Sequence, residues 1–313
     1  GLGDVYKRQE RAWRLAPDDP ITALAFSPDG RKLVAATDDG RFHLCDPATG
    51  RPLATFPPAE TPAQPHAPRT VGTYAGSRAV SFSPDGALLL TGERDGSIRV
   101  WEVATRMEAL RLVGHASRVT LSAFGPDARS ILSTGSDAAV YQWDARPVGS
   151  PAESAWDALA AEDAAVAYRA TWALTDDPAG AVRTLRAKLP PAAVPTPEEL
   201  AGLIDRLSAD QFAAREAATR TLADLGPLVV PALKAAAGGK LSVEARERVT
   251  KLLGRKADEL TPSGLRSVRA VAVLERVATP EAKALLREWA AGADGAPLTE
   301  EARWAVRRLK GQR

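Results

Sequence analysis

Histidine and cysteine are scarce in this sequence, and their scarcity limits the chemistry that it can do. The 313 residues contain three histidines, His43, His66 and His115, and one cysteine, Cys45. Neither His43 nor His66 has a carboxylate or a thiol at metal-ligand spacing, and a lone cysteine excludes an intramolecular disulfide and a four-cysteine zinc site. Phosphate-binding loops, metalloprotease motifs and nucleophile elbows do not occur. We therefore predict no catalytic residue, no cofactor and no metal, and the compartment stays open.

Composition and charge exclude further classes of function. The sequence is 45% hydrophobic and 26% charged, which is typical of a globular protein. Its 41 basic residues are balanced by 39 acidic ones, whereas a nucleic-acid-binding protein must neutralise many phosphates. The basic stretches 246–256 and 303–313 are interleaved with acids, so we expect most of their side chains on solvated helix faces. Because no apolar run reaches about 18 residues, we expect no membrane-spanning helix.

A pattern of Phe, Asp and an indole or thiol recurs in the first half of the chain. Phe26, Phe82 and Phe124 each open a short sequence that contains Pro-Asp two residues later. An aspartate follows each Phe after thirteen residues, and a Trp or Cys follows after nineteen. In repeat order these residues are Asp39 and Cys45, Asp95 and Trp101, and Asp137 and Trp143. The constant internal spacing indicates a repeated structural unit.

Each repeated unit has the pattern of four short strands. In the first unit, alternating or apolar runs over 21–25, 33–36, 41–46 and 51–56 are separated by Pro-Asp-Gly and similar turn sequences. Four short strands in about 42 residues are typical of a β-propeller blade. Between the first two units, residues 57–68 are rich in proline, which lacks a backbone donor. We expect this stretch to be an extended surface loop.

The third unit carries the clearest resemblance to a known family. It opens with Gly114-His115 and closes its third strand with Trp143-Asp144, so it resembles a blade of the WD-repeat proteins. The resemblance implies a structural tetrad in which an aspartate accepts from an imidazole, the imidazole bonds a hydroxyl, and the hydroxyl accepts from an indole N–H. The four residues are His115, Ser133, Asp137 and Trp143.

The other two units keep only part of this tetrad. The second unit retains Thr91, Asp95 and Trp101, and the first retains Asp39. Cys45 occupies the Trp position of the first unit, where we expect a small apolar core residue and not a nucleophile.

These units predict the architecture of the first half. We interpret residues 10–147 as a partial WD-repeat β-propeller of about three blades, and the third blade lacks an outer strand because prolines follow Asp144 closely. Closed propellers have four to eight blades, so we expect this chain to be the C-terminal fragment of a longer bacterial protein. Residues 1–9 resemble a translated sequencing-adapter read-through and are left out of the fold.

The second half predicts an all-α domain over residues 148–313. Apolar residues recur there at helical spacing, and Asp210 stands where an N-cap would begin the helix 211–225. Another helix should run from Pro227 to Gly238. The remaining predicted helices cover 154–161, 163–174, 178–189, 242–253, 263–277, 280–291 and 299–309. Two stretches resemble HEAT-like helical pairs, which leaves a helical repeat and a helix bundle as alternatives.

The predicted fold favours a non-catalytic protein–protein interaction scaffold. Partner contacts are expected at the turns that contain Asp29, Asp85 and Asp127, and in the loop 57–73. One alternative is the regulatory C-terminal part of a larger bacterial kinase, protease or transcription factor. A further alternative is nucleic-acid binding by the basic helices. Protein partners are expected, membrane is not, and the oligomeric state stays open.

Overall fold

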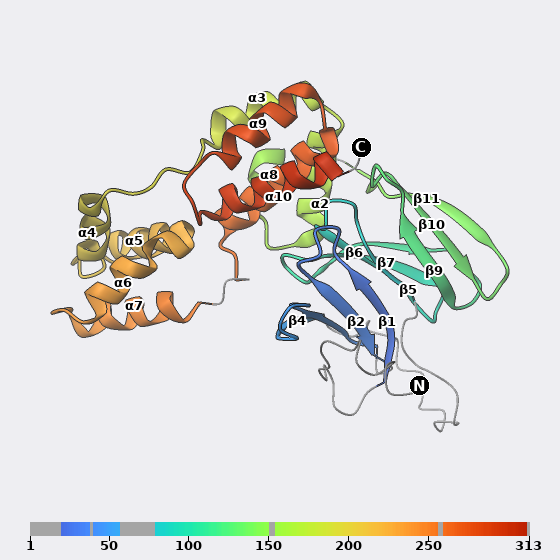
Figure 1. The fold of residues 1–313 in the computed structure, drawn as a ribbon, viewed down its shortest axis with the longest axis horizontal. Coiled ribbons are helices and arrows are strands. Elements are labelled where there is room, and N and C mark those ends of the chain that lie inside the picture. The colour runs from blue at the N-terminus through green and yellow to red at the C-terminus, as the bar shows by residue number, and fades with distance from the viewer. Residues whose placement is uncertain (1–19, 38–39, 57–78, 150–153, 256–258, 312–313) are drawn as a thin grey trace, which may run out of the picture. The chain divides into compact units, whose positions relative to one another are not determined.

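The computed structural model describes residues 20–37, 40–56, 79–149, 154–255 and 259–311 (Figure 1). The chain divides into two compact units that meet between Ala145 and Arg146. The described strands belong to the first unit and the described helices to the second, and each unit is considered by itself.

The first unit consists of consecutive antiparallel sheets. Its first sheet has the order β1 (Ile21–Phe26), β2 (Leu33–Thr37), β3 (Phe42–Cys45) and β4 (Pro52–Phe56). The second has the order β5 (Ala79–Phe82), β6 (Leu88–Gly92), β7 (Ser97–Glu102) and β8 (Glu108–Val113). The third contains β9 (Val119–Phe124), β10 (Ser130–Gly135) and β11 (Val140–Asp144). These are the three blades of the predicted partial propeller, and the described part of the third blade has three strands as expected.

Positive-φ residues form the tight turns of the blades. The Pro-Asp-Gly turns place Gly30 and Gly86 at φ of 69° and 70°, a conformation that glycine adopts without steric cost. In the third blade the corresponding residue is Ala128, with φ of 58°. The turn is therefore conserved in geometry among the blades although the third has lost its glycine.

Adjacent blades pack against each other through their first strands. β1 contacts β5, and β5 and β6 contact β9. Apolar residues of the first two blades share one core, which includes Val34, Phe42 and Leu44 from the first and Leu89 and Trp101 from the second. A Cβ atom at position 92 would clash with Cγ1 of Val119. Because Gly92 has no Cβ atom, β9 can approach β6 this closely.

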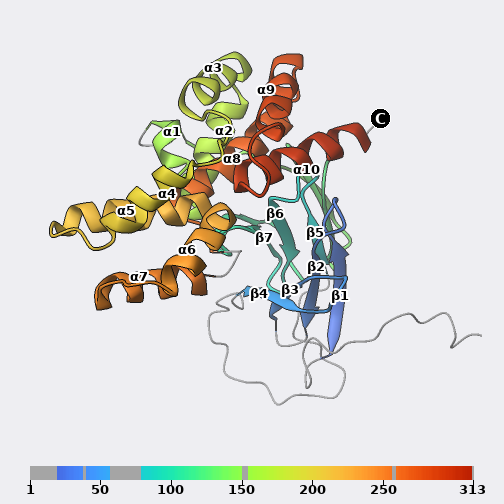
Figure 2. The same ribbon diagram turned by 60° about the vertical axis from the view of Figure 1, so that its left-hand side comes forward.

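Among the described residues of the second unit, the helices pack around two separate apolar cores. The first core belongs to α1 (Ala155–Ala158), α2 (Ala164–Thr175), α3 (Pro178–Lys188), α8 (Pro262–Val277), α9 (Pro280–Ala290) and α10 (Pro297–Gly311). The second belongs to α4 (Pro197–Arg206), α5 (Phe212–Leu225), the 3-10 turn η2 (Gly226–Val229), α6 (Val230–Ala237) and α7 (Val243–Gly254). The two cores share no residue, and α4–α7 form a group in both views (Figures 1 and 2).

Packing in the first helical core joins segments that are far apart in the sequence. α8 contacts α2 and α3 as well as α9 and α10, although α4–α7 lie between α3 and α8 in the chain. Arg269 of α8 donates to the backbone carbonyls of Leu159 and Ala161 at 2.7 and 2.6 Å, and Trp289 Nε1 donates to Leu189 O at 3.0 Å. These bonds satisfy carbonyls that follow α1 and α3 and would otherwise lack a helical partner.

The helical half differs from the sequence prediction at three places. Asp210 is not the N-cap of α5, because the helix begins one residue later, and its N-cap Gln211 makes no side-chain capping bond. The helix α4 was not predicted at all, although Thr196 and Glu199 form a capping box at its start. Arg308, expected among solvated basic residues, is buried in an ion pair with Glu275.

Candidate functional site

The structure brings His115, Ser133, Asp137 and Trp143 together in the third blade. His115 lies just before β9, Ser133 lies on β10, Asp137 lies in the β10–β11 turn and Trp143 lies on β11. His115 Nε2 is 2.8 Å from Ser133 Oγ, and its Nδ1 is 3.1 Å from each carboxylate oxygen of Asp137. Trp143 Nε1 donates to Ser133 Oγ at 2.8 Å. The hydrogen bonds thus form a continuous chain from a turn to the third strand of the blade.

Three members of this chain are connected as in a serine-hydrolase triad, with hydroxyl, imidazole and carboxylate in order. A nucleophile must reach its substrate, yet the His115 side chain is fully buried and Ser133 is buried as well. The indole N–H of Trp143 donates to the hydroxyl from one side, and the Tyr141 ring packs perpendicular to the imidazole with the ring centroids 4.6 Å apart. The geometry is therefore that of a structural clamp.

Backbone donors hold Asp137 in its charged form. Burial pushes the pKa of this carboxyl up, but the backbone N–H groups of Ala116 and Ala139 and the ring of His115 outweigh burial and lower the pKa. Ala116 N is 2.9 Å from Oδ2, and Ala139 N is 3.2 Å from Oδ1. A charged acceptor strengthens each of these bonds, so Asp137 connects the segment before β9 to the β10–β11 turn.

The second blade builds a different polar chain from its partial set. Trp101 Nε1 donates to Thr91 Oγ1 at 3.0 Å, as Trp143 does to Ser133. The Thr91 hydroxyl then donates to Glu93 Oε1 at 2.7 Å. Asp95 accepts from the backbone N–H and the hydroxyl of Ser97 at 2.9 and 2.6 Å, so its carboxylate bonds within its own turn.

Sequence reasoning did not identify Glu93 as part of the second blade's polar chain. Burial raises the pKa of its carboxyl, although the bond from Thr91 and the charge of Arg99 act in the opposite direction. The sequence signal for this bond is that Glu93 stands two residues after Thr91 and directly follows β6, so its side chain reaches back to the Thr91 hydroxyl.

In the first blade the structure describes Cys45 but not Asp39, which lies outside the described residues. Cys45 is fully buried, and its thiol is 3.3 Å from the carbonyl oxygen of Leu33. Burial and the neighbouring charge of Asp46 raise the pKa of the thiol, which disfavours the reactive thiolate. Its surroundings are those of a packed core residue.

The three turn aspartates use their carboxylates within their own turns. Asp29 accepts from Ser27 Oγ at 2.6 Å and from Arg31 N at 3.0 Å, and Asp127 accepts from Arg129 N at 2.9 Å. Asp85 makes the same kind of bonds but is buried. Asp127 is exposed and Asp29 half-buried, so these two turns remain candidates for partner contact. The loop 57–73, with His66, lies outside the described residues.

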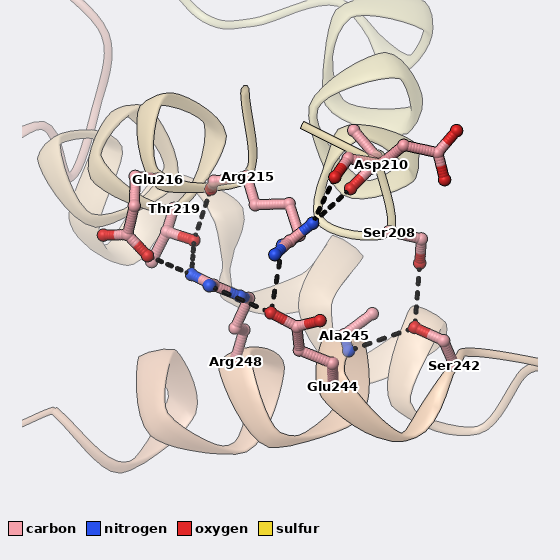
Figure 3. Close-up of polar contacts among 10 residues, drawn as sticks. Ser208, Asp210, Arg215, Glu216, Thr219, Ser242, Glu244, Ala245 and Arg248 are labelled. Carbon is pink, nitrogen blue, oxygen red and sulfur yellow. Dashed lines mark hydrogen bonds and ion pairs between the residues drawn. The ribbon is translucent and has the colours of Figure 1, made fainter. Parts of the chain in front are cut away.

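Arginines join α5 to α7 in the second helical core (Figure 3). Arg248 of α7 pairs with Glu216 and donates to Thr219 Oγ1 at 3.0 Å, both on α5. Arg215 of α5 lies 3.0 Å from Glu244 of α7. Its guanidinium also donates to the carbonyls of Ala209 and Asp210, which precede α5.

Ion pairs engage part of both basic stretches. Besides Arg248, Arg303 pairs with Asp294 and Glu300, and Arg308 pairs with Glu275 and Glu301 at 2.8 and 3.2 Å. These partners reduce the positive charge that each stretch presents. Anion binding would have to compete with carboxylates already in place.

The described residues lack two further kinds of feature. They contain no group of three or more His, Cys, Asp or Glu side chains that could hold a metal ion. Among the helices that the structure describes, none is long and apolar enough to cross a membrane.

Comparison with protein families places WD repeats on the blades. Residues 69–102 and 108–144 match the model described as WD domain, G-beta repeat, and these ranges cover the second and third sheets. Residues 6–65 match the model described as Anaphase-promoting complex subunit 4 WD40 domain, a range that includes the first sheet.

Individual proteins are similar over less than half of the chain. Transducin beta-like protein 3 of Bos taurus is 30% identical over 138 residues, which are 44% of this chain and 16% of the bovine protein. The solved structures of U3-55K and of the RRP9 WD40 repeats are each 25% identical, with a TM-score of 0.36, and cover 43% of this chain and 38% of theirs. The chain therefore spans a small part of these relatives. Its first unit contains stretches that are similar in sequence to WD repeats.

Proposed function

We propose that this chain is a non-catalytic scaffold for protein–protein interaction, with a partial WD-repeat propeller over residues 10–147 and a HEAT-like helical domain over 148–313. The observation that carries the proposal is that Ser133, His115 and Asp137 use their hydrogen bonds within the blade. The residue types that would do chemistry are buried there, and Trp143 completes their hydrogen bonds. A site whose polar groups are all used internally supports folding and leaves binding to the surface.

Further support comes from the matched families and from the surface of the blades. One matched model is named for the WD40 domain of a subunit of a complex, the anaphase-promoting complex. The turns at Asp29 and Asp127 are held rigid by side-chain bonds while part of each turn faces solvent. Rigid turns lose little conformational entropy when a partner binds, so they suit specific recognition.

Affinity capture from the source cells tests this function. The bait is the full chain, compared with the Asp29→Asn and Asp127→Asn variants. Asparagine keeps an oxygen that can accept the turn hydrogen bonds but removes the charge, so the fold is retained. We expect a specific partner that binds the wild-type chain and is reduced at least several-fold by one of the variants.

Asp205→Asn is the matched control, because Asp205 is an exposed aspartate on α4 and belongs to the helical unit, not to a blade turn. A partner lost equally with all three variants would argue against recognition by the turns. The scaffold proposal itself is wrong if the wild-type chain captures no specific partner while a turnover assay finds a substrate whose conversion requires Ser133.

A further inference from the structure

The third blade exposes the sheet face that the first two blades bury. Positions three residues before and eight and sixteen residues after the repeat phenylalanine share one face of each sheet. In the second blade they are Ala79, Leu90 and Ile98, which are 2%, 0% and 0% exposed. In the third blade they are Leu121, Leu132 and Val140, which are 67%, 50% and 73% exposed. The same repeat positions therefore have opposite environments.

The covering element in the second blade is the first strand of the next blade. β9 contacts β5, β6 and β7, and Val119 of β9 lies against Gly92. Ser81 Oγ donates to Ser122 O of β9 at 3.1 Å. The exposed face of the third blade is therefore equivalent to the face of the second blade on which β9 packs, and it could bind the first strand of a further blade in the same way.

The first blade exposes the complementary surface on its own first strand. Ile21, Leu24 and Phe26 of β1 are 47%, 57% and 62% exposed. The residues of β9 equivalent to Ile21 and Leu24 are Val119 and Ser122, which are 0% and 5% exposed because the second blade covers them. The described blades therefore carry both halves of one blade-to-blade contact, one on the first sheet and one on the third.

We propose that two copies of this chain dock head to tail, with β1 of each copy seated on the exposed face of β9–β11 of the other. The side chains that line both surfaces are apolar or uncharged except for Asp144 at the end of β11, and large exposed apolar faces mark interaction sites. The contact joins two different surfaces, so it closes into a ring when the rotation permits. Two sets of the three described blades give six, within the range of about four to eight seen in closed propellers. This pairing is independent of the scaffold function.

The repeat spacing predicts which residues meet across the new contact. Ser81 and Ser122 meet between the second and third blades, and their equivalents are Ala123 in the third blade and Leu24 in the first. In a Cys45→Ser background, one preparation carries Leu24→Cys and a second carries Ala123→Cys. After mixing and mild oxidation, we expect a disulfide-linked pair that contains one copy of each. The control replaces Ala123→Cys by Val113→Cys, at a residue of β8 that is also exposed but lies outside both surfaces.

The mass in solution gives a second, independent readout. Light scattering after size exclusion should give twice the chain mass for the wild type and for Val113→Glu. Leu132→Glu and Phe26→Glu each damage both contacts of a symmetric pair, so each should run as a single chain. Mixed together they restore one intact contact, and a weaker pair should reappear.

These substitutions replace exposed side chains, so we expect the fold to persist. Circular dichroism of each variant checks this. A wild-type chain that stays single at tens of micromolar overturns the proposal. An open series of larger assemblies overturns the closed pair. So does a cross-link between Leu24→Cys and Val113→Cys that is as strong as the predicted one.

Discussion

At the scale of single residues, the second and third blades share one hydrogen bond. Trp101 donates to Thr91 and Trp143 donates to Ser133, each from an indole N–H to the hydroxyl of the neighbouring strand. The further partner of the hydroxyl differs, because it is Glu93 in one blade and His115 in the other. The indole-to-hydroxyl bond is thus the common element, and the group beyond it varies.

Trp101→Phe and Trp143→Phe should each cost about 1 kcal/mol of unfolding free energy beyond the change in packing, because each removes one donor from a buried hydroxyl that keeps its other partner. His115→Ala should cost more, about 2–3 kcal/mol, because it removes one buried hydrogen-bond partner from Ser133 and another from Asp137. Urea unfolding of the full chain, monitored by strand circular dichroism, measures the differences. Equal losses for all three variants would contradict the chain of bonds described here.

Glu93 makes the stability of the second blade depend on pH. Because burial raises its pKa in the fold, the protonated form is favoured there, and stability is lost as pH rises through that raised pKa. Glu93→Gln removes this loss while its amide oxygen still accepts from Thr91. We expect the variant to be more stable than wild type at pH 7. The difference should shrink toward pH 4, near the unfolded pKa of about 4.3.

Thermal melts of both proteins between pH 4 and pH 8 provide the measurement for Glu93→Gln. Asp95→Asn is a suitable control, because the pKa of Asp95 is lowered: burial opposes the shift, but bonds from Ser97 outweigh it. Its effect on stability should therefore have the opposite sign. Parallel melting curves for wild type and Glu93→Gln across this range would show that the carboxyl does not influence folding.

At the scale of elements, the strands could be predicted more accurately than the helix starts. Pro-Asp-Gly and the fixed Phe–Asp–Trp spacing limit each strand to a few residues, and the observed β1–β4 begin and end within one residue of the prediction. Helix starts depend on one side chain. Asp210 has a capping residue type, but Arg215 binds its carbonyl and the helix begins later. α4 was missed although Thr196-Pro-Glu-Glu is a capping-box sequence.

The capping of α4 and α5 can be tested by opposite changes. Thr196→Ala removes the bond from the Glu199 backbone N–H to the Thr196 hydroxyl and should destabilise the helical unit by about 1 kcal/mol. Gln211→Asp supplies the missing acceptor at a backbone conformation (φ −80°, ψ 123°) that suits an N-cap, and should stabilise it by about 0.5–1 kcal/mol. Urea unfolding followed by helical circular dichroism compares them, with Gln211→Ala as the control. A loss of stability in Gln211→Asp would mean that Arg215 already fixes this turn.

At the scale of the whole molecule, local patterns predicted the units but not the connections within the helical one. The tetrad residues could be named because the blade repeats itself, so spacing carries information about three-dimensional position. The helices have no such repeat. Nothing in the sequence around α8 indicates that it packs against α2 and α3. These helices lie far earlier in the chain, and the bond from Arg269 to Leu159 joins residues that are 110 positions apart. Long-range pairing depends on the shapes of apolar faces, which hydrophobic periodicity does not encode.

The two separate helical cores predict that the helical unit has two folding units. Leu222 lies in the core of α4–α7 and Leu286 in the core of α1–α3 with α8–α10, and both are fully buried leucines on helices. Each Leu→Ala change should lower the free energy of unfolding by about 2–5 kcal/mol, and only for the core that contains the leucine. Within residues 146–313 the tryptophans are Trp156, Trp172, Trp289 and Trp304, and all four lie on helices of the first group. In that part of the chain expressed alone, fluorescence therefore reports on the first group, whereas circular dichroism reports on both.

We expect residues 146–313, expressed alone, to fold because both cores are complete within them. In this protein Leu222→Ala should shift part of the circular dichroism transition to lower urea and leave the tryptophan transition in place. Leu286→Ala should shift the tryptophan transition. If both variants shift the two signals together, the cores unfold as one cooperative unit, and the division of the helices into separate groups has no energetic meaning.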